Sequence, residues 1–125
     1  MADWPMRILV CGGREYDDYL TVRNTLDHLI YDGDHTNWED HTIISGGARG
    51  ADTLAVRFAQ NYGTKLRVFQ PDWKRYGKSA GHIRNQQMLD EGKPNKVVAF
   101  PGGSGTADMI RRAKKANIEV IEIDS

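Results

Sequence analysis

The chain has 125 residues, a length that suits a single domain over residues 1–125, of which we expect 1–5 to be flexible. Its 17 acidic and 17 basic side chains balance, which excludes a general attraction to nucleic acid or an anionic membrane. No secretory signal precedes Met6 and no apolar run is long enough to span a membrane, so we expect a cytoplasmic protein. Cys11 is the only cysteine, and its place in an apolar run predicts a small buried side chain.

Short apolar runs alternate with helical patterns from one end of the chain to the other. Five runs are typical of buried strands, at residues 7–11, 42–45, 66–69, 96–100 and 118–123. Helices are predicted around 18–30, 51–63, 83–89 and 109–116, with Asp17 or Asp18 capping the first. The polar segments 32–40 and 71–81 are predicted to be loops. This order predicts an α/β fold with an open parallel sheet of about five strands and helices on both faces.

Three histidines, His28, His35 and His41, lie in or near the segment 32–40. Their spacing matches no metal-ligand template, and a solvated surface loop explains them better. We therefore expect no metal site, and the sequence indicates no cofactor.

Glycine pairs follow three of the predicted strands, at Gly12-Gly13, Gly46-Gly47 and Gly102-Gly103. In an open parallel sheet these turns fall on one edge, outside the carboxyl ends of the strands, where ligands bind. Glycine admits a ligand close to the backbone, and the free N–H groups of the following helix suit phosphate. The turns match neither the dinucleotide fingerprint nor the P-loop, which disfavours a standard NAD dehydrogenase or a P-loop ATPase.

Polar and aromatic residues accompany these turns. Arginines offer a planar fork for phosphate, while Asp52 and Asn85 are suited to ribose hydroxyls or base edges. Other roles remain open: Arg14 and Arg49 as plain surface residues, and Asp52 as a helix cap. Trp73 and Tyr76 are suited either to stacking on a base or to anchoring their loop in the core. The predicted ligand-binding residues are Gly12, Gly13, Arg14, Gly46, Gly47, Ala48, Arg49, Gly50, Asp52, Trp73, Arg84, Asn85, Pro101, Gly102, Gly103, Ser104, Gly105 and Thr106.

Several longer motifs resemble one known family over nearly the whole chain from Met6 onward. The motifs are Gly46–Asp52 (GGARGAD), Asp72–Trp73, Tyr76–Lys78 (YGK), Ala80–Met88 (AGHIRNQQM) and Phe100–Met109 (FPGGSGTADM). On these motifs the chain is similar to the YspA-like branch of the SLOG superfamily, which includes the LOG enzymes and the DNA-processing DprA proteins. The resemblance implies a Rossmann-like fold that binds nucleotides or nucleotide-derived ligands, and symmetric oligomers are expected.

LOG enzymes are phosphoribohydrolases that release the base from a nucleoside 5′-monophosphate, and their Pro-Gly-Gly-x-Gly-Thr-x-x-Glu motif is similar to Pro101–Met109. Here Met109 stands in the place of the motif glutamate, and Asp108 is next to it. Arg84 corresponds to the arginine of the LOG Arg-Lys pair, whereas Asn85 replaces the lysine. The resemblance thus implies that binding elements are kept while the catalytic set is incomplete.

These observations lead to one main hypothesis and two alternatives. The main hypothesis is a sensor, carrier or sequestering protein for a phosphate-bearing nucleotide-type small molecule, acting as a homodimer or larger homo-oligomer. The first alternative is a LOG-like nucleotide N-glycosidase in which Arg84 holds phosphate and Asp108 stabilises the ribosyl cation. The second, a single-stranded DNA binder similar to DprA, lacks support from the balanced charge, and no membrane partner is expected.

Overall fold

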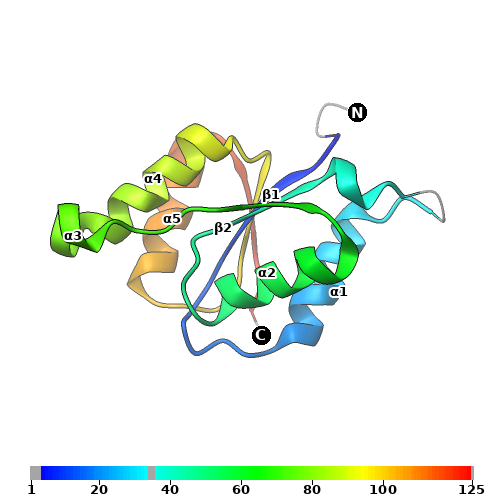
Figure 1. Ribbon diagram of the computed structural model, residues 1–125, viewed down its shortest axis with the longest axis horizontal. Coiled ribbons are helices and arrows are strands. Elements are labelled where there is room, and N and C mark those ends of the chain that lie inside the picture. Colours follow the sequence, from blue (N-terminus) through cyan, green and yellow to red (C-terminus); the bar gives the residue numbers. More distant parts are fainter. Residues whose placement is uncertain (1–3, 34–35, 125) are drawn as a thin grey trace.

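The computed structural model describes residues 4–33 and 36–124, and it contains one parallel sheet. The strand order is β3-β2-β1-β4-β5, so the chain first winds outward from β1 and then crosses to its other side. This is a doubly wound arrangement, and it confirms the predicted α/β fold with five parallel strands (Figure 1). The strands are β1 (Arg7–Cys11), β2 (Thr42–Ser45), β3 (Lys65–Val68), β4 (Lys96–Ala99) and β5 (Glu119–Glu122).

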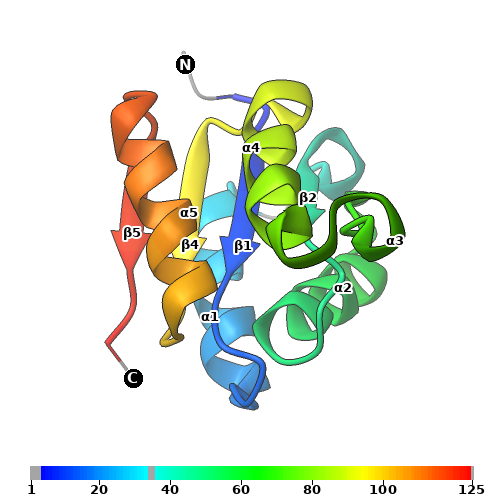
Figure 2. The ribbon, with the colours of Figure 1, turned by 90° about the vertical axis from the view of Figure 1, so that its left-hand side faces the viewer.

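Four longer helices cover the two faces of the sheet. The helices α1 (Tyr19–Ile30) and α2 (Ala51–Tyr62) pack on one face, and α4 (Ala80–Gly92) and α5 (Ser104–Lys115) on the other. Figure 2 looks onto the face that carries α4 and α5. Asp18 caps α1 by accepting a hydrogen bond from the backbone N–H of Thr21, as one of the two predicted caps.

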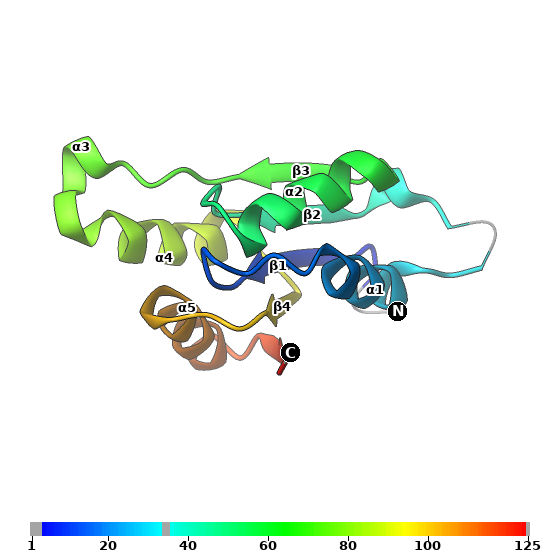
Figure 3. The ribbon, with the colours of Figure 1, turned by 90° about the horizontal axis from the view of Figure 1, so that it is seen from below.

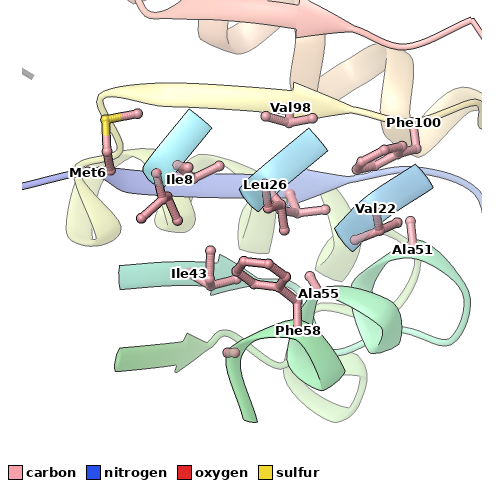
Figure 4. Packing of buried hydrophobic residues seen from close by; sticks show 13 residues of the cluster. Met6, Ile8, Val22, Leu26, Ile43, Ala51, Ala55, Phe58, Val98 and Phe100 are labelled. Carbon is pink, nitrogen blue, oxygen red and sulfur yellow. The ribbon is translucent and has the colours of Figure 1, made fainter. Parts of the chain in front are cut away.

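The central strand β1 supplies side chains to both apolar layers. Ile8 packs with Leu26 and Phe58 in the layer that carries α1 and α2 (Figure 4), and Val10 belongs to the same cluster. Leu9 and Cys11 point to the opposite layer, beneath α4 and α5. Each fully buried aliphatic side chain contributes about 1.5–3 kcal/mol, so β1 is fixed firmly from both sides. The end of β1 is consequently a rigid base for the turn that follows.

The two segments predicted to be loops contain short helices. Residues 71–81 hold α3 (Trp73–Tyr76) and the 3-10 turn η2 (Gly77–Ser79), because Asp72 accepts a hydrogen bond from the N–H of Arg75 and so caps α3. Figure 3 shows α3 beyond the carboxyl end of β3, at the same end of the molecule as the start of α4. Within 32–40 lies the 3-10 turn η1 (Trp38–Asp40), where Trp38 packs against Phe58.

His41 corrects the prediction of a solvated histidine loop. Its side chain is 1% exposed, and its Nδ1 accepts a hydrogen bond of 2.9 Å from the backbone N–H of Met6. The ring of Trp4 lies edge-on to it at 4.5 Å, so the described part of the segment expected to be flexible contacts the core. His28 is exposed on α1, while His35 and residues 1–3 lie outside the described residues.

Two further searches cover only the residues that the structure describes. Among them, no three His, Cys, Asp or Glu side chains gather as a metal site would require. No helix in those same ranges has the length and apolar character needed to cross a membrane.

Candidate functional site

A cavity of about 460 Å³ opens where the predicted ligand edge lies, at the carboxyl ends of β1 and β4. The strand order reverses at this point, which is where open α/β sheets bind ligands. We call it the main cavity. Predicted residues from all three glycine-rich turns and from α4 line it: Gly12, Gly13, Arg14, Ala48, Asp52, Trp73, Arg84, Asn85, Gly103, Ser104, Gly105 and Thr106.

Other predicted glycines serve to bring the turns together and do not line the main cavity. A Cβ at Gly50, whose φ is +83°, would lie 2.2 Å from the carbonyl oxygen of Gly13. A Cβ at Gly102 would lie 2.3 Å from Thr106 Oγ1, and the carbonyl of Pro101 accepts a 2.8 Å hydrogen bond from Gly13 N–H. The turns therefore interlock, and glycine is required there for close approach of backbones.

Asp52 places a buried carboxylate in the wall of the main cavity. Its side chain is 7% exposed, and Oδ2 accepts a 3.2 Å hydrogen bond from the N–H of Ala48. The residue therefore holds the turn before α2, whereas Gly50 occupies the cap position. Burial raises the pKa of Asp52 to about 6, although the bond from Ala48 and the charge of Arg84 oppose this rise.

Arg84 reaches the main cavity from α4, and the backbone holds its guanidinium in place. Nη1 donates to the carbonyl of Gly46 and, at 3.3 Å, to that of Phe69. Nε donates to Asn85 Oδ1 at 3.2 Å. Burial lowers the pKa of Arg84, while the nearby Asp52 carboxylate opposes that change. Nη2 makes no hydrogen bond to a residue that the structure describes, so it remains for a ligand.

Asn85 lines the main cavity and also joins two helices. Its Nδ2 donates to the carbonyl of Gly105 at 3.2 Å and to Asp108 Oδ2 at 3.0 Å, and its Oδ1 accepts from Arg84. With both donors used and 5% of its surface exposed, Asn85 joins α4 to the start of α5 and positions the Arg84 side chain.

The carboxylate of Asp108 lies behind the main cavity and does not line it. It accepts hydrogen bonds from Arg111 at 2.9 Å and from Arg112 at 2.8 Å, and His82 Nδ1 is 3.4 Å away. Burial works to raise the pKa of Asp108, but hydrogen bonds from Arg112 and Asn85 outweigh it and the pKa is lowered. Successive positions on a helix are turned by about 100°, so Asp108 faces α4.

Met109 is directed into the core. It is fully buried in the apolar layer with Leu9 and Val97. Met109 corresponds to the LOG motif glutamate and Asp108 adjoins it. Neither position brings a carboxylate into the main cavity. The structure places the expected catalytic Asp108 in a structural ion pair network instead.

The sequence analysis missed several residues that line the main cavity. Lys78 and His82 both stand inside the motifs that carry the family resemblance, so their position there was an available signal. Cys11 also lines the main cavity. Its thiol is buried, and burial raises the pKa of this thiol to about 12. The other two lining residues that were missed are Gly81 and Met88.

Trp73 was one of the predicted residues, with two possible roles. It is 52% exposed and lines the cavity, so it does not anchor its loop in the core.

A second hollow of about 300 Å³, here called the side hollow, adjoins the main cavity. Both are lined by Arg14, Ala48, Trp73 and Arg84. The side hollow adds two of the predicted residues, Gly47 and Arg49, and two that were not predicted, Gln70 and Pro71.

These features define a Rossmann-like α/β protein with a ligand edge built from interlocked glycine turns. A family model described as "YspA, cpYpsA-related SLOG family" matches residues 6–76, and the chain belongs to that family. It is 35% identical over 122 residues to the Gene 61 protein of Mycobacterium phage D29, covering 92% of this chain and 94% of that protein.

The fold is similar to that of a solved DNA processing protein A (DprA) from Streptococcus pneumoniae. The TM-score is 0.74 at 20% sequence identity, over 96% of this chain and 50% of the DprA chain. The present chain therefore spans about half the length of that relative, and the likeness concerns the fold.

Proposed function

We propose that the protein binds a nucleotide or nucleotide-derived ligand through its phosphate, as a sensor, carrier or sequestering protein. The observation that carries this proposal is the convergence of cationic groups on one cavity at the topological switch point. Arg14, Lys78 and Arg84 line it, and Asp52 supplies the one carboxylate found among its described lining residues. Such a charge balance favours an anionic ligand.

The start of α5 is suited to the phosphate. No side chain caps this helix at Gly103, so its first N–H groups face the main cavity without a protein partner from the cap residue. At Gly103 and Gly105 a Cβ would meet no atom within 4 Å, which leaves room for a phosphate beside the backbone. Asp52 in the cavity wall would then accept hydrogen bonds from ribose hydroxyls. The exposed ring of Trp73, which also lines the cavity, would stack on the base.

A thermal-shift experiment tests this proposal. Nucleoside phosphates are expected to raise the melting temperature, whereas the corresponding nucleosides are not, because the site is centred on phosphate. At a hundredfold excess over the dissociation constant, mass action gives about 2.7 kcal/mol of stabilisation. Native mass spectrometry of freshly purified protein, searching for a co-purified ligand, identifies the base.

Two lysines of one segment provide a matched pair of variants. Lys78 lines the main cavity, while Lys74 is exposed on α3 and does not. Lys78→Ala is expected to weaken nucleotide binding, and Lys74→Ala, which removes the same charge, is expected to leave it unchanged. Equal stabilisation by nucleoside and nucleotide would contradict a phosphate-centred site.

A nucleotide N-glycosidase is a second candidate, and Asp52 is the observation that favours it. Cleavage of the N-glycosidic bond builds positive charge on the ribose, which a carboxylate in the cavity wall stabilises. Asp52 meets this requirement better than Asp108, which is committed to Arg111 and Arg112. Chromatography of free base from AMP, GMP, CMP and UMP tests it. Release that is lost in Asp52→Asn and kept in Asp108→Asn would support catalysis at Asp52.

Assembly and location complete the proposal. We expect a homodimer or larger symmetric oligomer, and light scattering that gives a mass of 14.1 kDa, that of one chain, at high micromolar concentration would contradict this. A cytoplasmic location agrees with a lone buried cysteine that needs no oxidising compartment. Binding to nucleic acid or a membrane is not expected from a chain with balanced charge.

A further inference from the structure

We propose that the side hollow is a subsite for a second phosphate group, so that the ligand carries two phosphates held at separate positions. This inference rests on the proposed function, because the first phosphate is the one assigned to the start of α5. The ligand class is a nucleotide phosphorylated at two ends, such as a nucleoside 3′,5′-bisphosphate.

The charge of the side hollow is the first observation. Three arginines, Arg14, Arg49 and Arg84, line it, and no carboxylate stands among the described residues of its lining. Three guanidinium groups around one concave surface make it electropositive, which favours an anion there. Phosphate is an anion that arginine binds well, and Arg84 contributes Nη2 because its Nε and Nη1 already donate within the protein.

The connection between the two hollows is the second observation. Arg14, Trp73 and Arg84 stand in the lining of both, so the side hollow is continuous with the main cavity. Of the two hollows, Asp52 and the start of α5 line only the main cavity, whereas Arg49 lines only the side hollow. A ligand with its ribose near Asp52 therefore has one phosphate toward α5 and room for another toward the arginines.

Arg49 is available to a phosphate although it already has a partner. Its Nη2 is 2.5 Å from Glu15 Oε1, and the two side chains are 72% and 85% exposed. An ion pair this exposed is weak and opens readily. A phosphate monoester carries more negative charge than a carboxylate and replaces Glu15 at Arg49, so Glu15 weakens binding at this subsite.

The backbone of the turn gives the side hollow its shape. Gly47 has a φ of +72°, and a Cβ there would lie 2.6 Å from Gln70 Nε2. The amide of Gln70 can therefore lie flat against the turn, beside the arginine cluster. A side chain at position 47 would both strain the backbone and displace this amide.

Calorimetric titration with paired nucleotides tests the inference. The probes are the 5′-monophosphates and the 3′,5′-bisphosphates of adenosine, guanosine, cytidine and uridine, with ADP as a ligand whose two phosphates are adjacent. For the base that binds, the 3′,5′-bisphosphate is expected to bind about tenfold or more tightly than the monophosphate. ADP is expected to gain less, because its second phosphate stays beside the first.

Three variants assign any gain to the side hollow. Arg49→Gln is expected to remove the preference for the bisphosphate, so that the variant binds the bisphosphate and the monophosphate about equally. Glu15→Gln is expected to increase the preference, because it frees Arg49. Arg75→Gln, which removes an exposed arginine of α3 that lines neither hollow, is the matched control and is expected to change nothing.

The outcomes separate this inference from the proposed function. Equal affinity for the monophosphate and the bisphosphate would overturn the second subsite and leave the proposed function standing. A preference for the bisphosphate that survives Arg49→Gln would overturn the assignment to the side hollow. Failure of every probe to bind would overturn both, and a preference abolished by Arg49→Gln and strengthened by Glu15→Gln would establish the subsite.

Discussion

The side-chain amide of Asn85 donates a 3.0 Å hydrogen bond to the buried carboxylate of Asp108, and this bond joins α4 to α5 behind the main cavity. The same amide accepts a hydrogen bond from Arg84 Nε, so the position of the guanidinium depends on Asp108 through Asn85. Arg111 and Arg112 in turn fix the carboxylate. Asp108, which was expected to be catalytic, is thus connected through Asn85 to the arginine that lines the main cavity.

Replacement of Asn85 by Ala should therefore reduce both stability and ligand binding. It leaves Asp108 Oδ2 and the carbonyl of Gly105 without one buried donor each, at a cost of about 1–3 kcal/mol in unfolding free energy. Urea denaturation measures that loss, and calorimetry should show weaker nucleotide binding by the variant that remains folded. Gln87→Ala, on the exposed face of the same helix, is the control and should change neither quantity.

The interlocked turns predict a contrast between two glycines with similar φ. Gly50 and Gly63 have φ values of +83° and +81°. A Cβ at Gly50 would lie 2.2 Å from the carbonyl oxygen of Gly13, whereas at Gly63 it would meet nothing within 4 Å. Gly50 has a ψ of -132°, outside the left-handed helical region, whereas Gly63 has a ψ of 21° within it. Gly50→Ala should thus cost about 3 kcal/mol or more from the overlap and the backbone strain together, and Gly63→Ala about 1–2 kcal/mol from backbone strain alone. Equal losses in urea denaturation would show that the turns do not require the close contact.

The strands, and the edge at which the glycine turns gather, were predictable from sequence because their signals are local, whereas the order of the strands within the sheet was not predicted. Each strand is a short apolar run ending in a turn, and parallel strands bring such turns to one edge. The helix α3 was missed because its four residues are too few for a periodic pattern, and its cap Asp72 follows a proline that suggested only a break. Burial of His41 depends on a hydrogen bond to Met6, 35 positions away, and no local pattern encodes it.

The site was predictable as a set of residues, but the role of each residue was not. Motif membership identified Arg84, Asn85 and Asp108 without showing which of them face a ligand. That distinction depends on the rotation of α5 against α4, which places Met109 in the core and Asp108 against Asn85. Similarly, Gly50 is needed for close packing between two turns and Gly46 for space beside the Arg84 guanidinium, and a glycine-rich pattern does not distinguish these purposes.

His41 should make the protein less stable at mildly acidic pH. Burial lowers its pKa from the usual 6.5, with Asp40 opposing, because the neutral Nδ1 accepts the bond from Met6. Above pH 6.5 the His41 ring is neutral in both the folded and the unfolded protein, so its contribution to stability is fully present there. It is lost as the pH falls from 6.5 to the folded pKa, by up to about 1.4 kcal/mol per pH unit.

Denaturation of three proteins between pH 5 and 8 checks this expectation. His41→Asn keeps an acceptor near Met6 without a titrating ring, so the difference in stability between it and the native protein should change with pH below 6.5. His28→Asn, an exposed site on α1, should run parallel to the native protein. Parallel curves for both variants would show that His41 does not titrate on unfolding.

Asp52 should act in the opposite direction, with a cost to stability that appears as the pH rises. Its pKa is about 6 in the folded protein, raised by burial from 3.8. Below pH 3.8 the carboxyl is protonated in both states and the full stability is present. As the pH rises from 3.8 to about 6, the unfolded chain ionises first and stability is lost. Two pKa units correspond to at most about 3 kcal/mol.

Asp52→Asn should therefore be more stable than the native protein at pH 7 to 8 and equally stable near pH 4. The gain falls short of 3 kcal/mol because Arg84, whose charge Asp52 balances, then lacks its partner. Asp17→Asn, at an exposed carboxyl, provides the control, and it should show no such gain in stability between pH 4 and pH 8. If Asp52 accepts hydrogen bonds from a ribose, the stabilised variant should also bind ribonucleotides more weakly than the native protein. A variant that is less stable at neutral pH would instead show that the charge attraction between Asp52 and Arg84 outweighs the burial of the carboxylate.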